Sequence, residues 1–108
     1  MRYAWTVRNV AHIPRHALVP AQVETAIGDR YRTVAVVQVG GEERGVPHGA
    51  CAIGGRLRVL RVVFVIRGGA VRVITAVRGR GRQTRPYLTR RAAMEAQEAQ
   101  EDGDDGDD

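Results

Sequence analysis

Three glycine pairs interrupt the part of the chain that is richest in β-branched residues. The pairs are Gly40-Gly41, Gly54-Gly55 and Gly68-Gly69. Valine-rich segments that stop at a glycine pair are typical of strands that enter hairpin turns. The sequence therefore predicts an antiparallel meander of about four strands. We expect the strands at residues 31–39, 50–53, 56–67 and 71–77, with a loop over residues 40–47.

In two of these strands, the sequence pattern predicts which face of the sheet the side chains occupy. In the third strand the alternation of arginine and apolar residues reverses parity at Leu60. We expect either a β-bulge near Leu60 or burial of the second half of this strand on both faces. In the fourth strand, one face is expected to carry Arg72, Ile74, Ala76 and Arg78.

Helices are predicted before and after the strands in the chain. Residues 6–16 have helical spacing, with Arg8, His12, Arg15 and His16 on one side, and Pro14 predicts that this helix is short and kinked. Pro20–Ile27 begins with a proline and ends before Gly28, which favours a second helix with Val23, Ala26 and Ile27 inward. A basic loop over residues 78–85 precedes a third helix from Pro86 onward.

The chain of 108 residues is long enough for one domain. Its single cysteine, Cys51, has no internal partner and is expected in the core, which fits a reducing cytoplasm. The longest purely apolar run, residues 62–66, is too short to cross a bilayer, and no secretory signal is expected.

Charge is divided sharply along the chain. All 17 basic residues are arginine; with four acids they leave +13 on residues 1–91, whereas residues 92–108 carry eight acids and no base. A body this basic is expected of a polyanion binder, with nucleic acid the first candidate, although a GC-rich genome also favours arginine. The acidic residues 92–108 are expected to form a helical extension and, from Asp102, a disordered tail.

The residues of the chain argue against most kinds of catalytic or cofactor-binding site. His12 and His16 have the spacing of half a zinc site, but surrounding arginines would repel a cation, so neither a metal nor a cofactor is expected. The chain has no serine and no phosphate-binding loop. What remains is acid–base chemistry by histidine flanked by arginine, of which His16 beside Arg15 is an example, unless the histidines merely cover a helix surface.

The N-terminal pattern Trp5-x-x-x-Asn9-x-x-His12-Ile13-x-Arg15-His16, followed by Pro20-x-x-Val23-Glu24, resembles BrnT-like toxins of type II toxin–antitoxin pairs. The segment Val71-Arg72-Val73-Ile74-Thr75-Ala76 and the arginine and tyrosine that follow it resemble the end of the same family. The likeness covers residues 3–88. Thr6, Ala17, Val19 and Val77 depart from the family pattern.

The resemblance implies a RelE-like α+β fold, with two N-terminal helices on the sheet and a C-terminal helix, and a toxin domain over residues 1–91. It also implies a metal-independent RNA endonuclease that blocks translation in the cytoplasm until a cognate antitoxin masks it. The catalytic residues would be Arg15, His16, Arg78 and Tyr87. We expect RNA contacts from Arg8, His12, Arg32, Arg72, Arg80 and Arg82.

Two other classes of function fit the same residues. One is a non-catalytic nucleic-acid-binding or regulatory module on the same scaffold, and the other is a structural or partner-binding protein. Convergence of Arg15, His16 and Arg78 in one cleft would favour the enzyme. The assembly expected is either a homodimer or a toxin–antitoxin heterotetramer, with no membrane partner.

Overall fold

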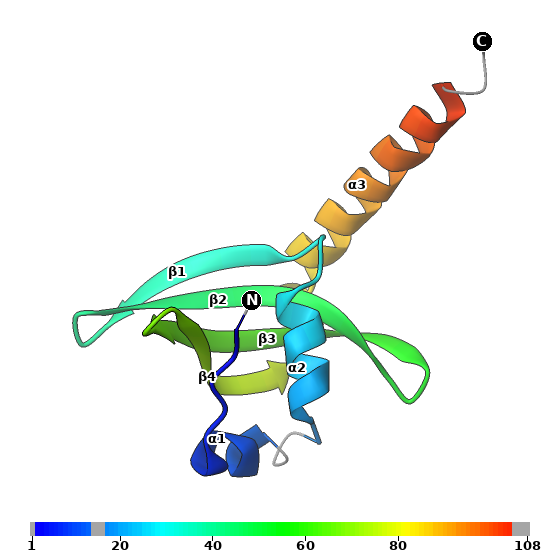
Figure 1. Ribbon diagram of the computed structural model, residues 1–108. Helices are drawn as coiled ribbons and strands as arrows, with labels where there is room; N and C mark the ends of the chain where they lie inside the picture. Colours follow the sequence, from blue (N-terminus) through cyan, green and yellow to red (C-terminus); the bar gives the residue numbers. More distant parts are fainter. Residues whose placement is uncertain (1, 14–16, 105–108) are drawn as a thin grey trace.

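The computed structural model describes residues 2–13 and 17–104, which form an α+β fold around one antiparallel sheet (Figure 1). In chain order the elements are α1 (Val7–His12), α2 (Pro20–Ile27), β1 (Thr33–Val39), β2 (Glu42–Ile53), β3 (Arg56–Arg67), β4 (Ala70–Arg78), the 3₁₀ helix η2 (Gly81–Gln83) and α3 (Arg85–Asp104). The strand order is β1-β2-β3-β4, so the predicted four-stranded meander is confirmed. None of the helices in the described part of the chain combines the length and hydrophobicity needed to span a lipid bilayer.

The loop predicted over residues 40–47 is wrong, because the chain turns at once and β2 begins at Glu42. Gly40 and Gly41 have φ angles of 58° and 79°, a left-handed conformation that glycine adopts without a steric penalty. β1 and β2 then pair without interruption from Thr33 to Val39. Pro47 has no N–H to donate, and the paired positions of β2 and β3 omit it together with Val46.

The irregularity predicted near Leu60 lies further along β3, where the register with β4 shifts between Val63 and Phe64. Val63 pairs with Thr75 and Phe64 with Val73, so Ile74 is the extra residue of a bulge on β4. The bulge lets Val73 and Ala76 both enter the core. The prediction that Arg72 and Ala76 share a face is therefore wrong. Val62 and Val63 are both buried, so the middle of β3 is covered on both faces, but Ile66 is 64% exposed. The second alternative, burial of the second half of the strand on both faces, is therefore confirmed only in part.

The core lies between α2 and one face of the sheet, which we call the core face. Val23, Ala26 and Ile27 of α2 are buried there as predicted, and Cys51 is buried with them. Gly49 permits this approach, because a Cβ at that position would lie 1.8 Å from the carbonyl oxygen of Ala26. A side chain at residue 49 would therefore push α2 away from β2.

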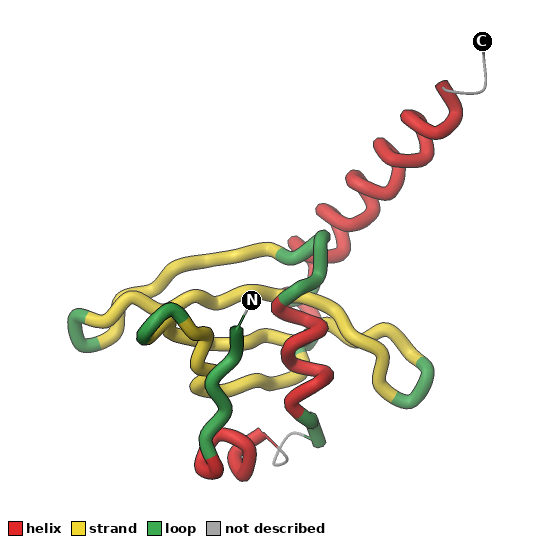
Figure 2. The backbone as a smooth tube through the Cα atoms, viewed as in Figure 1, coloured by secondary structure: helices red, strands yellow, loops and turns green. Residues whose placement is uncertain are grey.

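The N-terminal segment covers the outer edge of β4 (Figure 2). Ala4 N donates to Val71 O and Val71 N donates to Arg2 O, each at 2.9 Å, in a short parallel pairing. α1 follows, capped by Thr6, and ends at His12. The predicted helix is thus short; its predicted kink at Pro14 lies outside the described residues.

α3 is a helix of 20 residues that projects from the body beyond the start of β1 (Figure 1). It begins one residue before the predicted start. Residues 102–104, which were predicted to be disordered, belong to this helix, so that prediction is wrong for them. Residues 105–108 lie outside the described residues.

Candidate functional site

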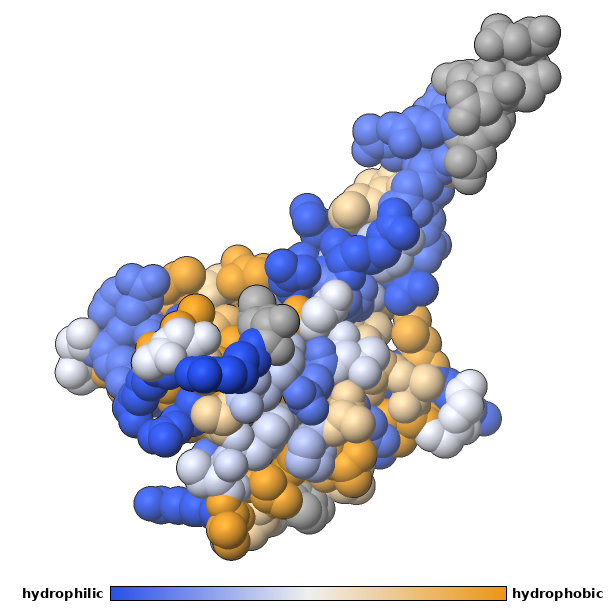
Figure 3. Space-filling model, in the orientation of Figure 1, coloured by the Kyte–Doolittle hydropathy of each residue, from blue (hydrophilic) through white to orange (hydrophobic). Residues whose placement is uncertain are grey.

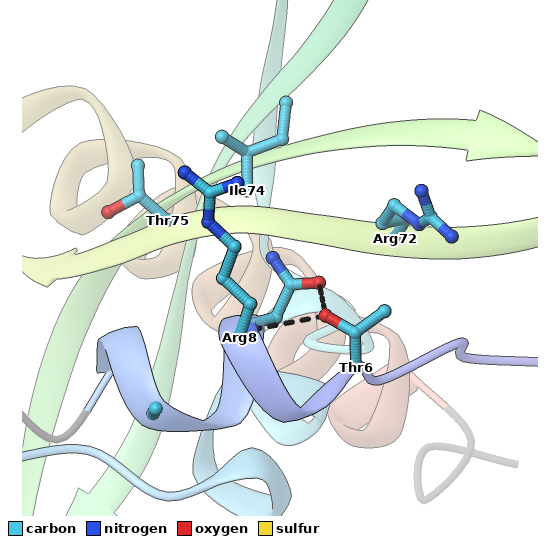
Figure 4. A pocket seen from close by; sticks show the side chains of 7 residues that line it. Thr6, Arg8, Arg72, Ile74 and Thr75 are labelled. Atoms are coloured by element: carbon cyan, nitrogen blue, oxygen red, sulfur yellow. Dashed lines mark hydrogen bonds between the residues drawn. The ribbon is translucent and has the colours of Figure 1, made fainter.

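A pocket of about 740 Å³ lies between α1 and β4 (Figure 4). Its lining residues are Thr6, Arg8, Asn9, Ala11, Arg72, Ile74 and Thr75. Figure 4 shows the side chain of Arg8 reaching from α1 toward β4. The bulge at Ile74 brings consecutive residues of β4 to this wall. We call this the Arg8–Arg72 pocket.

The first turn of α1 fixes the polar side of the pocket. The hydroxyl of Thr6 accepts a hydrogen bond from the backbone N–H of Asn9 at 3.1 Å, which caps the helix. The same hydroxyl donates to Asn9 Oδ1. These two bonds orient Asn9 and stabilise the first turn of α1, the helix that carries Arg8.

The Arg8–Arg72 pocket is positively charged and has no acid in its lining. Among the described residues, neither arginine forms an ion pair. Nε of Arg72 is buried without a hydrogen-bond partner. Arg8 and Arg72, both predicted to contact RNA, line the same pocket.

Arg78 and Arg80 lie in a second pocket at the far end of β4. Its volume is about 440 Å³, and its wall also includes Arg58 of β3. Arg78 is six residues from Arg72 along the strand, a separation of about 20 Å at the usual rise of a strand. Sequence analysis did not select Arg58, although its place in the alternating arginines of β3 is a usable signal.

Arg32 lies in a third pocket, of about 510 Å³, beside the start of β1. Arg30 and Arg90 line the same pocket, and Arg30 forms an ion pair with Glu98 of α3. Arg82, in η2, is exposed and lines none of these three pockets. The arginines predicted to contact RNA therefore lie in separate places.

Tyr87, predicted to be catalytic, is fully buried. Its hydroxyl donates to Asp29 Oδ2 and accepts from a guanidinium N–H of Arg91 at 3.1 Å. Burial, together with the carboxylate of Asp29, raises the pKa of Tyr87 to about 12. Both hydrogen-bonding roles of this hydroxyl are thus occupied inside the protein, by Asp29 and Arg91.

Asp29 joins three parts of the fold, and sequence analysis did not select it. Oδ2 accepts from Ala50 N at 2.8 Å as well as from Tyr87, while Oδ1 accepts from Tyr31 N at 2.9 Å. Burial alone would raise the pKa of Asp29, but these three hydrogen bonds outweigh burial and lower it. The available signal is that Asp29 is the only acid between Glu24 and Glu42.

Arg15 and His16 lie outside the described residues, and the side chain of His12 is not described. Their convergence with Arg78 therefore stays a prediction. The histidine that the structure does describe is His48, which pairs with Arg61 across β2 and β3. Burial and the nearby charge of Arg61 lower the pKa of His48.

Comparison with known proteins identifies no relative of this chain. No protein-family profile, curated protein sequence or solved structure matches the chain at a significant level. The arginine-lined pockets and the short sequence motifs are therefore the features that bear on the function of this chain.

Proposed function

We propose that this protein binds RNA through the arginines along β4 and acts as the toxin of a type II toxin–antitoxin pair, cutting RNA without a metal. The observation that carries RNA binding is the Arg8–Arg72 pocket, whose lining contains two arginines and no acid. A guanidinium offers five donors in a planar arrangement that fits phosphate oxygens. The pocket at Arg78 and Arg80 provides a second contact for the same strand of RNA.

The proposed cutting step uses His16, Arg15 and Arg78. His16 removes the proton of a 2′-hydroxyl, and the 2′-oxygen attacks the neighbouring phosphorus. The bond from phosphorus to the 5′-oxygen breaks, which leaves a 2′,3′-cyclic phosphate, and the protonated His16 gives its proton to the departing 5′-oxygen. Arg15 and Arg78 stabilise the extra negative charge on phosphorus. Support for the enzyme comes from the BrnT-like motifs and from the order of two short helices followed by a four-stranded meander, which we propose to be RelE-like.

RNA binding is tested by single arginine variants that change the charge equally. We expect Arg8→Ala or Arg72→Ala to weaken binding of a short RNA about tenfold, because each removes a charge-assisted hydrogen bond. Arg56→Ala is the matched control, since Arg56 is exposed at the β2–β3 hairpin and lines none of the pockets described. Equal losses in all three variants, measured by fluorescence anisotropy, would show that only overall charge matters and would contradict the pocket.

Toxicity and cleavage are tested separately from binding. Expression of the chain in a bacterial host should arrest growth, and the purified chain should cut RNA in the presence of EDTA. His16→Ala should abolish both while its RNA affinity and circular dichroism stay unchanged. Equal toxicity of the two chains would remove His16 from the site.

A non-catalytic RNA-binding module is the second candidate function, and the position of Tyr87 favours it. The hydroxyl predicted to take part in catalysis is engaged by Asp29 and Arg91. If the chain binds RNA through Arg8 and Arg72 but neither cuts it nor arrests growth, this second function replaces the first.

A further inference from the structure

β1 is exposed on both faces over almost its whole length. Its four valines, Val34, Val36, Val37 and Val39, are 57%, 59%, 39% and 46% exposed. Because side chains alternate along a strand, Val34 and Val36 lie on the core face and Val37 and Val39 on the other. Figure 3 shows hydrophobic surface along this strand.

In the described part of the chain, no strand pairs with the outer edge of β1, unlike the opposite edge of the sheet. β4 is covered by the N-terminal segment, through the pairing of Tyr3 with Val71. No backbone hydrogen bond from the described residues reaches the outer side of β1. Edge strands are usually protected by charges, prolines or bulges, and Thr33–Val39 contains no charge or proline and pairs with β2 without a register shift.

We propose that β1 pairs with β1 of a second copy of this chain. The two strands run antiparallel across a two-fold axis at Val36, so the two sheets become one continuous sheet. In this register Thr33 lies opposite Val39 of the second copy, and Val36 lies opposite its own equivalent. Such an interface is self-complementary, as a two-fold dimer requires.

Charges at the two ends of β1 support a second copy over a foreign peptide. Antiparallel pairing places the start of one β1 beside the β1–β2 hairpin of the other copy. Arg32, at the start, donates only to the backbone oxygen of Asp29 among the described residues. Glu43, just after the hairpin, is exposed and has no ion pair with a described residue. The dimer therefore pairs Arg32 of each copy with Glu43 of the other.

The size of this interface sets the affinity that we expect. Stable interfaces usually involve about 20 to 30 residues on each side. β1 contributes seven residues, and α3, which projects beyond the same edge, adds contacts to the incoming hairpin (Figure 1). We therefore expect a dissociation constant in the range of about 1 to 100 μM.

Sedimentation equilibrium of the full chain without RNA tests the dimer. The average mass should rise with concentration from 11.8 kDa toward twice that value. Val36→Lys should hold the chain as a monomer, since it sets two like charges opposite each other. Ile66→Lys is the matched control, because Ile66 is also an exposed β-branched residue, 64% exposed, on β3. It should dimerise like the unmodified chain.

Two further variants test the register. Arg32→Glu should weaken the dimer, and Arg32→Glu with Glu43→Arg in the same chain should restore it. Under oxidation, Val36→Cys should form a disulfide between copies much faster than Val34→Cys, whose equivalents lie apart in this register. Cys51 is buried and should not interfere.

A chain that stays monomeric at about 1 mM, ten times the weakest affinity expected, would overturn the proposal. Dimers that persist unchanged in Val36→Lys would also overturn it, as would assemblies that grow beyond two copies. Because no RNA is present, these results are independent of the proposed function.

Discussion

At the scale of single residues, Asp29 is the main polar contact of the fold. One carboxylate binds the end of the α2–β1 connection through Tyr31, the middle of β2 through Ala50 and the start of α3 through Tyr87. Two of these three donors are backbone N–H groups, and neither has another hydrogen-bond partner among the described residues. Loss of the carboxylate would therefore leave buried donors unsatisfied.

Tyr87→Phe tests the contribution of one of these bonds. We expect the free energy of unfolding to fall by about 1.5 to 3 kcal/mol, because a hydrogen bond to a charged group is lost. RNA affinity should not change. Urea denaturation measures the loss, with Tyr31→Phe as the control, whose hydroxyl bonds to Glu98 near the surface at 3.1 Å. A Tyr87→Phe chain of full stability but reduced RNA cleavage would return Tyr87 to the active site.

Acid should weaken the same network. The pKa of Asp29 is lowered in the folded chain, so its carboxylate stabilises the fold above the unfolded pKa of about 3.9. That contribution is lost as the pH falls through the lowered value. We expect the stability difference between the unmodified chain and Asp29→Asn to be largest near neutral pH and to shrink below about pH 4. A difference that stays constant down to about pH 2 would contradict this prediction.

At the scale of elements, sequence patterns predicted α2 and three of the four strands but missed most of β2. Gly45, Pro47 and Gly49 have low strand propensity, and tertiary contacts override it here. Gly49 is required because Ala26 lies against it, a contact that no local pattern reveals. The equal spacing of the three glycine pairs was the available signal, since it leaves 12 residues for each of β2 and β3.

The candidate site was predictable only in part, because it too depends on tertiary contacts. The basic character of Arg8 and Arg72 is plain in the sequence, but they line one pocket because α1 packs beside β4, a long-range contact that no local pattern reveals. A bulge changes which face each later residue occupies, so simple alternation placed Arg72 beside Ala76 incorrectly. Asp29 escaped notice because its three donors are distant in sequence or belong to the backbone.

Gly49→Ala tests the contact between α2 and β2. A methyl group there would overlap the carbonyl of Ala26, and we expect a loss of about 3 kcal/mol or more in the free energy of unfolding. Gly45→Ala is the control. Its methyl group meets the side chain of Phe64 at 2.7 Å, and that ring can shift. Equal losses in urea denaturation would show that the approach of α2 is not the limiting contact.

At the scale of the whole molecule, the acidic C-terminal part does more than extend from a basic body. Glu98 forms an ion pair with Arg30, and Glu95 forms one with Arg91 at 2.7 Å. The first of these bonds holds an acid beside the pocket that Arg32 and Arg90 line. α3 thus offsets one of the three arginine charges of this pocket, that of Arg30.

Glu98→Gln should therefore strengthen RNA binding by about twofold to fivefold, the range of a surface ion pair worth up to about 1 kcal/mol. Glu101→Gln is the matched control, because it removes the same charge from an exposed position on the same helix. Both are measured by anisotropy at low salt and at about 150 mM salt, where screening reduces the difference. Equal increases in RNA affinity in the two variants would show that α3 affects RNA binding only through its overall charge.

The parallel pairing of Tyr3 with Val71 also determines when the fold can be completed during translation. The hairpins of the sheet join neighbours in sequence and can form in the order in which they leave the ribosome. Tyr3 precedes its partner Val71 by 68 residues. The N-terminal segment therefore has no partner strand for roughly 3 to 14 s after it is synthesised, at the usual rate of translation of 5 to 20 residues per second. Since α1 and β4 form the two walls of the Arg8–Arg72 pocket, a nascent chain has no such pocket until translation has passed β4.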